Sequence, residues 1–200
     1  MLTLSLIASV ALTGTYFEAR SCSVFAGPCH VSGEVVTDGR TAIVAVEFDS
    51  GTLAGYRAAA LIQSERNLSF GDERRSVLYL DVRASEAERA AIREAVEGRS
   101  GLRLGTVTAV ANAEIAMKVS GKTASVEVRE PGGGLLYSAR TSGRECLACS
   151  MPGELWYSPL SSGASADFAT VEEHRLADDR LGETFVRRDE AAAFVGRFAW

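Results

Sequence analysis

The residues best suited to chemistry in this chain are its cysteines, two of which lie three positions apart as Cys146 and Cys149. This pair stands between Gly143 and Pro152, which predict a loop on which both thiols can face one point. Met151 adds a third sulfur two residues further on. A loop of this composition is typical of a metal-binding clip or of a small redox pair.

The other two cysteines lie far upstream as Cys22 and Cys29, and Cys29 is followed by His30, one of the two histidines in the chain. Thiolate, thioether and imidazole groups suit Cu(I) and Zn(II), whereas calcium and magnesium require oxygen ligands. If the fold brings the two regions together, the sequence predicts a copper or zinc site, with copper favoured where the thioether takes part. Its ligands would be Cys29, His30, Cys146, Cys149 and Met151.

Two other interpretations of the cysteines stay open. As structural disulfides, Cys22–Cys29 and Cys146–Cys149 would each close a small loop, or the two loops would be joined across the fold. As a redox pair, Cys146 and Cys149 lack the strand-then-helix setting that lowers the pKa of the first thiol, because Pro152 prevents a clean helix start. Disulfides need oxidised cysteines and a metal site needs reduced ones, so a free-thiol count separates the two.

Composition sets limits on the fold and on the partners. The chain has 200 residues, 46% of them apolar, which is ample for one domain with a real core. Its 26 acidic and 21 basic residues give a net charge of −5 and are mixed throughout, so nucleic acid is not expected as a partner. Nineteen glycines, only four prolines and many runs of Val, Thr, Phe and Tyr indicate a β-rich domain.

The segment 1–12 is uncharged and mostly apolar, which resembles part of an export signal. It is too short for a stable membrane span. Export would place the protein in the periplasm or outside the cell, where disulfides persist, and a cytoplasmic location is the alternative. If the segment is not a signal, we expect a buried first strand or helix there. Residues 13–200 are expected to form a single domain.

Alternation of apolar and polar residues predicts strands along most of the chain. We expect them at 14–20, 30–36, 41–48, 58–62, 75–82, 104–110, 114–119, 124–128, 135–140, 168–174, 183–186 and 193–200. Ser85 followed by Glu88 forms a capping-box sequence, which predicts a helix over 86–97 that Gly98, followed by Gly101, ends. The expected fold is α+β, a predominantly antiparallel β-sheet with one main helix (about 86–97). Two sheet subdomains split near residue 101 are the alternative.

Two short stretches resemble the bacterial DUF1326 proteins. One is Gly14-Thr15-Tyr16-Phe17-Glu18 before a cysteine-bearing loop, and the other is Leu80-Asp81-Val82-Arg83-Ala84-Ser85 leading into the helix. The resemblance covers roughly residues 13–200. Members often carry several cysteines after the Gly-x-Tyr-x-Glu start, some as Cys-Pro-Cys, whereas this chain has only Cys22 and Cys29 there. Because the family has no established activity, the resemblance implies a fold and no reaction.

The sequence favours a non-catalytic protein, since no serine-hydrolase elbow, zinc-protease motif or phosphate-binding loop is present. We interpret Gly132-Gly133-Gly134 as a hairpin turn, Asp81 and Arg83 as a helix-capping or core ion pair, and the charged stretch 172–180, with His174, as solvated. The expected function is an exported protein that binds copper or zinc through its cysteines. A disulfide-stapled binding domain with an unknown ligand is the alternative.

Overall fold

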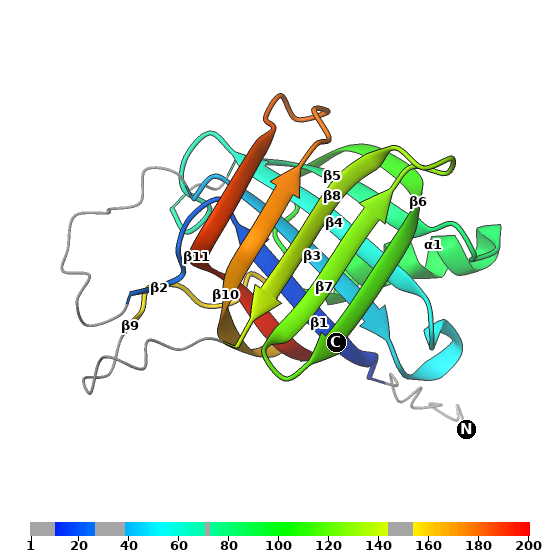
Figure 1. Ribbon diagram of the computed structural model, residues 1–200. Coiled ribbons are helices and arrows are strands. Elements are labelled where there is room, and N and C mark those ends of the chain that lie inside the picture. The colour runs from blue at the N-terminus through cyan, green and yellow to red at the C-terminus, as the bar shows by residue number, and fades with distance from the viewer. Residues whose placement is uncertain (1–10, 27–38, 71–72, 144–153) are drawn as a thin grey trace, which may run out of the picture.

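Nine strands of the protein close into a barrel, as the computed structural model in Figure 1 shows for the described residues 11–26, 39–70, 73–143 and 154–200. The order around the barrel is β1-β11-β10-β8-β7-β6-β5-β4-β3, and two further short strands, β2 and β9, form a separate ribbon. The barrel strands are β1 (Thr13–Arg20), β3 (Thr41–Phe48), β4 (Arg57–Ser64), β5 (Arg74–Asp81), β6 (Thr106–Ser120), β7 (Thr123–Arg129), β8 (Leu135–Ser142), β10 (Ala164–Leu176) and β11 (Phe185–Ala199). The ribbon strands are β2 (Phe25–Ala26) and β9 (Glu154–Leu155).

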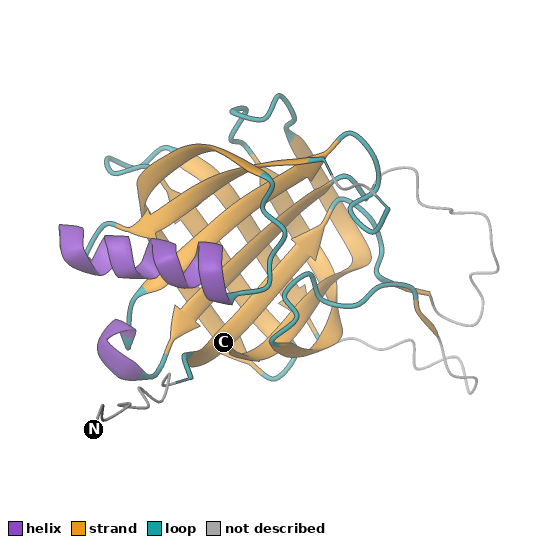
Figure 2. Ribbon diagram, turned by 180° about the vertical axis from the view of Figure 1, so that it is seen from behind, coloured by secondary structure: helices purple, strands orange, loops and turns teal. Residues whose placement is uncertain are grey.

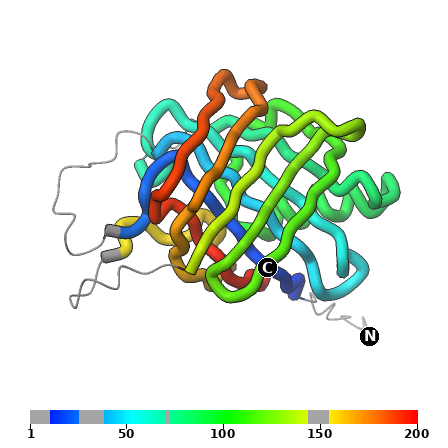
Figure 3. The backbone as a smooth tube through the Cα atoms, viewed as in Figure 1, coloured from blue at the N-terminus to red at the C-terminus, as the bar shows by residue number. Residues whose placement is uncertain are grey.

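The closed barrel corrects the predicted α+β fold with an open sheet, although the β-rich composition was predicted correctly. Closure depends on β1, which pairs antiparallel with β11 on one side and with β3 on the other. Figure 3 shows the blue N-terminal strand beside the red C-terminal one. β5 and β6 pair in parallel, because the helical segment between them crosses the outside of the barrel. Alternation predicts strands and faces but not partners, so it does not distinguish an open sheet from a closed one.

Two apolar clusters form around the barrel wall. The inner cluster draws residues from every barrel strand, among them Phe17, Ile43, Leu61, Val77, Ile115, Val126, Ala139, Val171 and Val195. The outer cluster lies between the helix and the outer faces of β3, β4 and β5, and it includes Val44, Ala60, Leu78, Ile92 and Val96. Figure 2 shows the helix lying across this side of the barrel. The strands under it are therefore buried on both faces, as β5 shows from Ser76 to Asp81.

The main helix begins where the capping box predicts. Helix α1 (Glu86–Glu94) starts after Ser85, whose hydroxyl accepts a hydrogen bond from the Glu88 amide while the Glu88 carboxylate accepts one from the Ser85 amide. It continues as a π-helical turn (Ala95–Arg99), and Gly101 then takes a positive φ of 67°. A 3-10 turn (Gly51–Leu53) is the other helical element that the described residues contain. No helix in these parts of the chain combines the length and apolar character needed to cross a membrane.

Several predicted strands are parts of longer ones. The segments 104–110 and 114–119 belong to the single strand β6, and 183–186 and 193–200 lie largely in β11. In β6 the inward residues between the two segments are alanines, which are only weakly hydrophobic. The alternation is therefore weak there, and one strand was predicted as two. The glycines at 132–134 form the predicted turn between β7 and β8. The predicted strand at 30–36 lies outside the described residues.

Candidate functional site

All five predicted metal ligands, Cys29, His30, Cys146, Cys149 and Met151, lie outside the described residues. Within the described ranges, no group of three or more His, Cys, Asp and Glu side chains is arranged to hold a metal ion. The structure does describe the chain on both sides of the two cysteine-bearing segments. We therefore describe the three parts of the structure that hold the flanks of these segments in place, and call them the supports.

The first support is the outer face of β1, where the family-like motif lies. Gly14, Tyr16, Glu18 and Arg20 are alternate residues, so all four face the same side of the strand. A Cβ atom at Gly14 would lie 2.1 Å from the Glu47 carbonyl oxygen and 2.4 Å from the Phe198 ring, so this position requires glycine. The other three side chains are at most 2% exposed. The spacing of the motif thus reflects one buried row of side chains.

This row holds a buried ion pair. The Arg20 Nε atom donates to Glu18 Oε1 at 2.5 Å, and the Tyr16 hydroxyl donates to Glu18 Oε2 at 2.5 Å. A buried ion pair offsets its desolvation cost only when its remaining polar atoms are also satisfied. Burial, and then the charge of Glu18, raises the pKa of the Tyr16 hydroxyl well above its usual value, so the phenol stays protonated and donates.

The second support is the segment 156–160, which we call the strap and which the ion pair attaches to the barrel. The Leu160 amide donates to Glu18 Oε2 at 2.8 Å, and the Arg20 guanidinium donates to the Ser158 carbonyl oxygen at 2.5 Å. The Arg20 guanidinium also lies 5.2 Å from the centre of the Tyr157 ring, a distance typical of cation–π contacts. The strap follows shortly after the Cys146–Met151 segment in the sequence. The β1 motif therefore anchors the chain just downstream of that segment.

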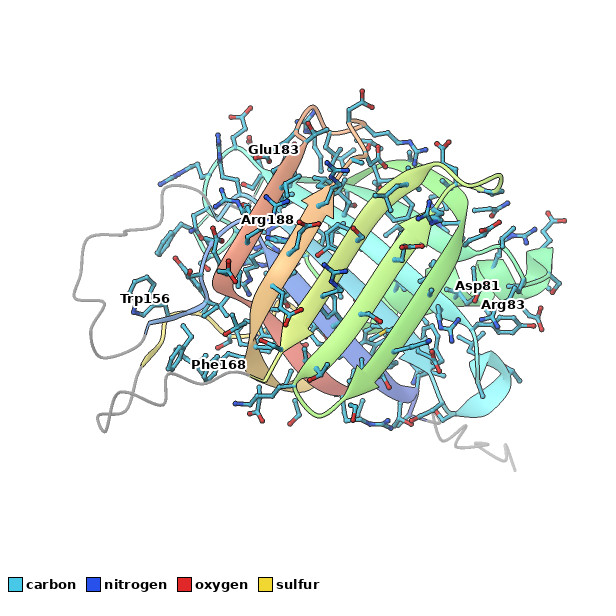
Figure 4. The ribbon with its side chains drawn as sticks, viewed as in Figure 1. Asp81, Arg83, Trp156, Phe168, Glu183 and Arg188 are labelled. Carbon is cyan, nitrogen blue, oxygen red and sulfur yellow. The ribbon has the colours of Figure 1, made fainter. Side chains whose placement is uncertain are left out.

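The third support is the β2–β9 ribbon, which pairs the flanks of the two cysteine-bearing segments. Ala26 pairs with Glu154 and Phe25 with Leu155 in antiparallel register, beyond the barrel wall at the left of Figure 1. The Phe25 ring stacks on Phe168 of β10, with centroids 3.8 Å apart and planes inclined by 5°. Figure 4 labels Phe168 and Trp156 on this side of the molecule. The ribbon is thus attached to the barrel by an aromatic pair.

Cys22 is the one cysteine among the described residues, and it carries a free, buried thiol. The alternative that pairs it with Cys29 in a disulfide therefore does not describe this structure. A Cβ atom at Gly39 would lie 2.8 Å from the Cys22 sulfur, so the backbone packs closely on the thiol. Burial raises the pKa of Cys22 to about 11, while the nearby Arg20 charge opposes that rise. Cys22 is consequently protonated at neutral pH and poorly suited to bind a metal.

Asp81 and Arg83 form an ion pair before the helical segment, as predicted, but only Asp81 lies in the core, because the Arg83 side chain is 53% exposed. The Asp81 side chain is 1% exposed and accepts hydrogen bonds from the backbone amides of Arg83 and Arg57. The Arg83 guanidinium donates to it at 2.6 Å (Figure 4). Although burial raises the pKa of Asp81, these bonds outweigh it and hold the pKa below its usual value. The pair shapes the turn after β5.

The prediction that the stretch 172–180 is solvated is wrong for Asp178, which is buried and accepts a hydrogen bond from the Tyr79 hydroxyl. It is also wrong for His174, which lies inside the barrel and is 1% exposed. Its Nδ1 atom lies 3.5 Å from the Tyr137 hydroxyl. Burial, with a smaller effect of Arg187, lowers the pKa of His174 to about 4, so the ring is neutral. A bulge between Val171 and Glu173 shifts the alternation by one residue. An unbroken alternation continued from Val171 would point residue 173 inward, which explains why the pattern did not reveal His174.

Comparisons with known proteins find similar solved structures but no matching sequence family. No family model matches the chain, and no curated protein sequence matches it. The chain is similar to acetoacetate decarboxylase from Legionella pneumophila subsp. pneumophila str. Philadelphia 1, at 8% identity and a TM-score of 0.43, covering 98% of this chain and 90% of that one. It is similar to another solved acetoacetate decarboxylase at 10% identity and a TM-score of 0.44, covering 96% and 87% of the two chains. Likenesses at this level carry no argument about activity or site residues.

Proposed function

We propose that this is a non-catalytic DUF1326-like protein, acting in the periplasm or outside the cell, that binds a soft metal ion between its two cysteine-bearing segments. The metal would be copper or zinc, and the ligands Cys29, His30, Cys146, Cys149 and Met151. The observation that supports the proposal is the β2–β9 pairing, because it joins the flanks of the two segments.

Chain lengths make the convergence feasible. Cys29 lies three residues after Ala26, and Met151 lies three residues before Glu154, the residue paired with Ala26. Three residues of chain span at most about 10 Å, and paired strands lie about 5 Å apart. The ligands nearest the ribbon, Cys29 and Met151, are thus each within about 10 Å of one of two paired residues. Because both flanks are already anchored, less conformational entropy is lost when the metal binds.

The same adjacency serves the alternative function, a disulfide-stapled binding domain, in which Cys29 would bond to Cys146 or Cys149. Metal binding needs deprotonated, reduced thiols, whereas the staple needs oxidised ones. The environment therefore decides between them, and an oxidising compartment favours the staple. Cys22 takes part in neither, because its thiol is buried and protonated.

The test is a competition titration of the full-length reduced protein with Cu(I) and Zn(II), preceded by thiol counts on the native and unfolded chain. We expect one metal ion per chain and one thiol, Cys22, that reacts only after unfolding. The double variant Cys146→Ser with Cys149→Ser should lose binding. Met151→Leu should weaken Cu(I) binding and leave Zn(II) binding unchanged.

Cys22→Ala is the matched control, because it removes a cysteine that the proposal leaves out of the site. It should retain full metal binding. If the reduced parent protein binds neither metal stoichiometrically, the proposal is wrong. A thiol count showing an intersegment disulfide in the native protein would then favour the staple.

A further inference from the structure

A cavity of about 280 Å³ lies at the end of the barrel where β3 and β5 begin and β4 ends. The loop between β10 and β11 forms its other wall. Figure 4 places Glu183, in this loop, at the opposite end of the barrel from Asp81 and Arg83. The cavity is lined by Arg40, Gln63, Ser64, Glu65, Arg75, Leu181, Gly182 and Glu183.

Four of these side chains are charged, two positive and two negative, and none forms an ion pair among the described residues. Elsewhere among the described residues, arginines commonly form ion pairs with acidic side chains, as Arg57 does with Glu47 and Arg188 with Glu173. At the cavity, opposite charges border one space without neutralising each other. Sequence reasoning did not find this site, because its residues come from four separate stretches of the chain.

The Gln63 amide explains how Arg75 and Glu183 are kept apart. The Arg75 guanidinium donates to Gln63 Oε1 at 3.1 Å, and Gln63 Nε2 donates to Glu183 Oε2 at 3.1 Å. The Thr41 hydroxyl donates to the same carboxylate oxygen. A second anchor for Arg75 is the Leu181 carbonyl oxygen, 3.5 Å away. Both charged groups are therefore held in place through a neutral spacer, with donor and acceptor capacity left over.

We propose that this cavity binds a small zwitterion of the amino-acid type, with its carboxylate on Arg75 and its ammonium group on Glu183. A guanidinium matches a carboxylate in shape and charge, and Arg40 adds a second positive group at the cavity. A ligand with a single charge leaves either Arg75 or Glu183 without a counter-charge. The volume is near the lower end of ligand pockets, about 300–1,000 Å³, which limits the ligand to a small molecule. This site is independent of the proposed metal site.

The experiment is isothermal titration calorimetry of the full chain with glycine, β-alanine and 4-aminobutyrate, zwitterions whose charges are increasingly far apart. Butyrate and butylamine are the singly charged probes. We expect at least one zwitterion to bind at least about tenfold more tightly than either single-charge probe. Arg75→Gln and Glu183→Gln should each weaken that binding by about tenfold or more.

Arg188→Gln is the matched control, since it removes an arginine from the outer surface and should leave binding unchanged. Because Arg75 and Glu183 also make hydrogen bonds within the protein, circular dichroism checks that each variant is folded. Arg40→Gln alters an exposed side chain and provides a further test, with weaker zwitterion binding expected. The proposal is overturned if no zwitterion binds, if butyrate or butylamine binds as tightly, or if the folded charge variants bind like the parent protein.

Discussion

Strands β1 and β6 both turn apolar side chains into the barrel, but their outer faces differ. The outer residues of β6 meet solvent, and its exposed positions alternate with buried ones along the second half of the strand. The outer residues Tyr16, Glu18 and Arg20 of β1 are fully covered. A strand needs no buried charges to complete a barrel wall, as β6 shows. The ion pair on β1 is therefore explained by what it holds, the strap that follows the Cys146–Met151 segment.

The largest expected effect comes from breaking this ion pair. Glu18→Gln keeps the size of the side chain but leaves the buried Arg20 charge without its carboxylate, so we expect unfolding to become easier by about 3–5 kcal/mol. Urea unfolding measures the difference. The exposed pair of Glu173 with Arg188, on β10 and β11, provides the control, and Glu173→Gln should cost about 0–1 kcal/mol. If the two substitutions lower the free energy of unfolding equally, the buried ion pair on β1 contributes no more than the exposed one.

A pH effect of somewhat smaller size is expected from His174 inside the wall. Its folded-state pKa of about 4 lies below the ordinary value of 6.5, so the unfolded chain binds the proton more readily. Stability should be full above pH 6.5 and fall as the pH drops towards 4, by up to about 3 kcal/mol. Urea unfolding of the metal-free protein across this range measures the slope. Burial of the ring is the main cause of this lowered pKa, and the nearby Arg187 charge adds a smaller effect.

His174→Gln should flatten the stability profile between pH 6.5 and 4, because the substitution removes the titrating ring. His30→Gln removes the only other histidine and should leave the slope as it is. A parent protein whose stability does not change over this range would show that His174 is not buried in a neutral state.

The smallest effect concerns the helix that covers β3, β4 and β5. Ser85→Ala removes the hydroxyl that caps α1, and we expect a loss of about 0.5–2 kcal/mol. Ser125→Ala, on the exposed outer face of β7, is the control and should change stability by less than about 0.5 kcal/mol. Thermal unfolding measures both. Equal melting temperatures for Ser85→Ala and the parent protein would mean that the capping box contributes nothing to the covered side.

Local signals in the sequence located much of this fold. The capping box at Ser85 and Glu88 predicted the helix start, and alternation predicted most strands. Barrel closure was missed because it depends on pairing between β1 and β11, strands at opposite ends of the described chain. The alanines inside β6 hid its continuity, and a bulge in β10 hid the inward position of His174. Each miss reflects long-range pairing or a local shift that periodicity does not record.

The candidate site was less predictable than the fold. The motif at Gly14, Tyr16 and Glu18 suggested a family, but its use as a buried row under the strap depends on contacts across more than a hundred residues of sequence. The β2–β9 ribbon has only two residues in each strand, which is too short for any alternation to indicate. The residues predicted as ligands of a soft metal were chosen by side-chain type alone, whereas the segments that flank them could be placed only from the structure.

The most direct test of the account is X-ray absorption at the zinc edge on the reduced full-length protein carrying one equivalent of zinc. If both segments bind one ion, the spectrum will show sulfur ligands at about 2.3 Å and a nitrogen ligand at about 2.0 Å. Cys29→Ser should then remove one sulfur, and His30→Ala should remove the nitrogen. Spectra that change with Cys146→Ser or Cys149→Ser but not with Cys29→Ser or His30→Ala would contradict the claim that the two segments share a site.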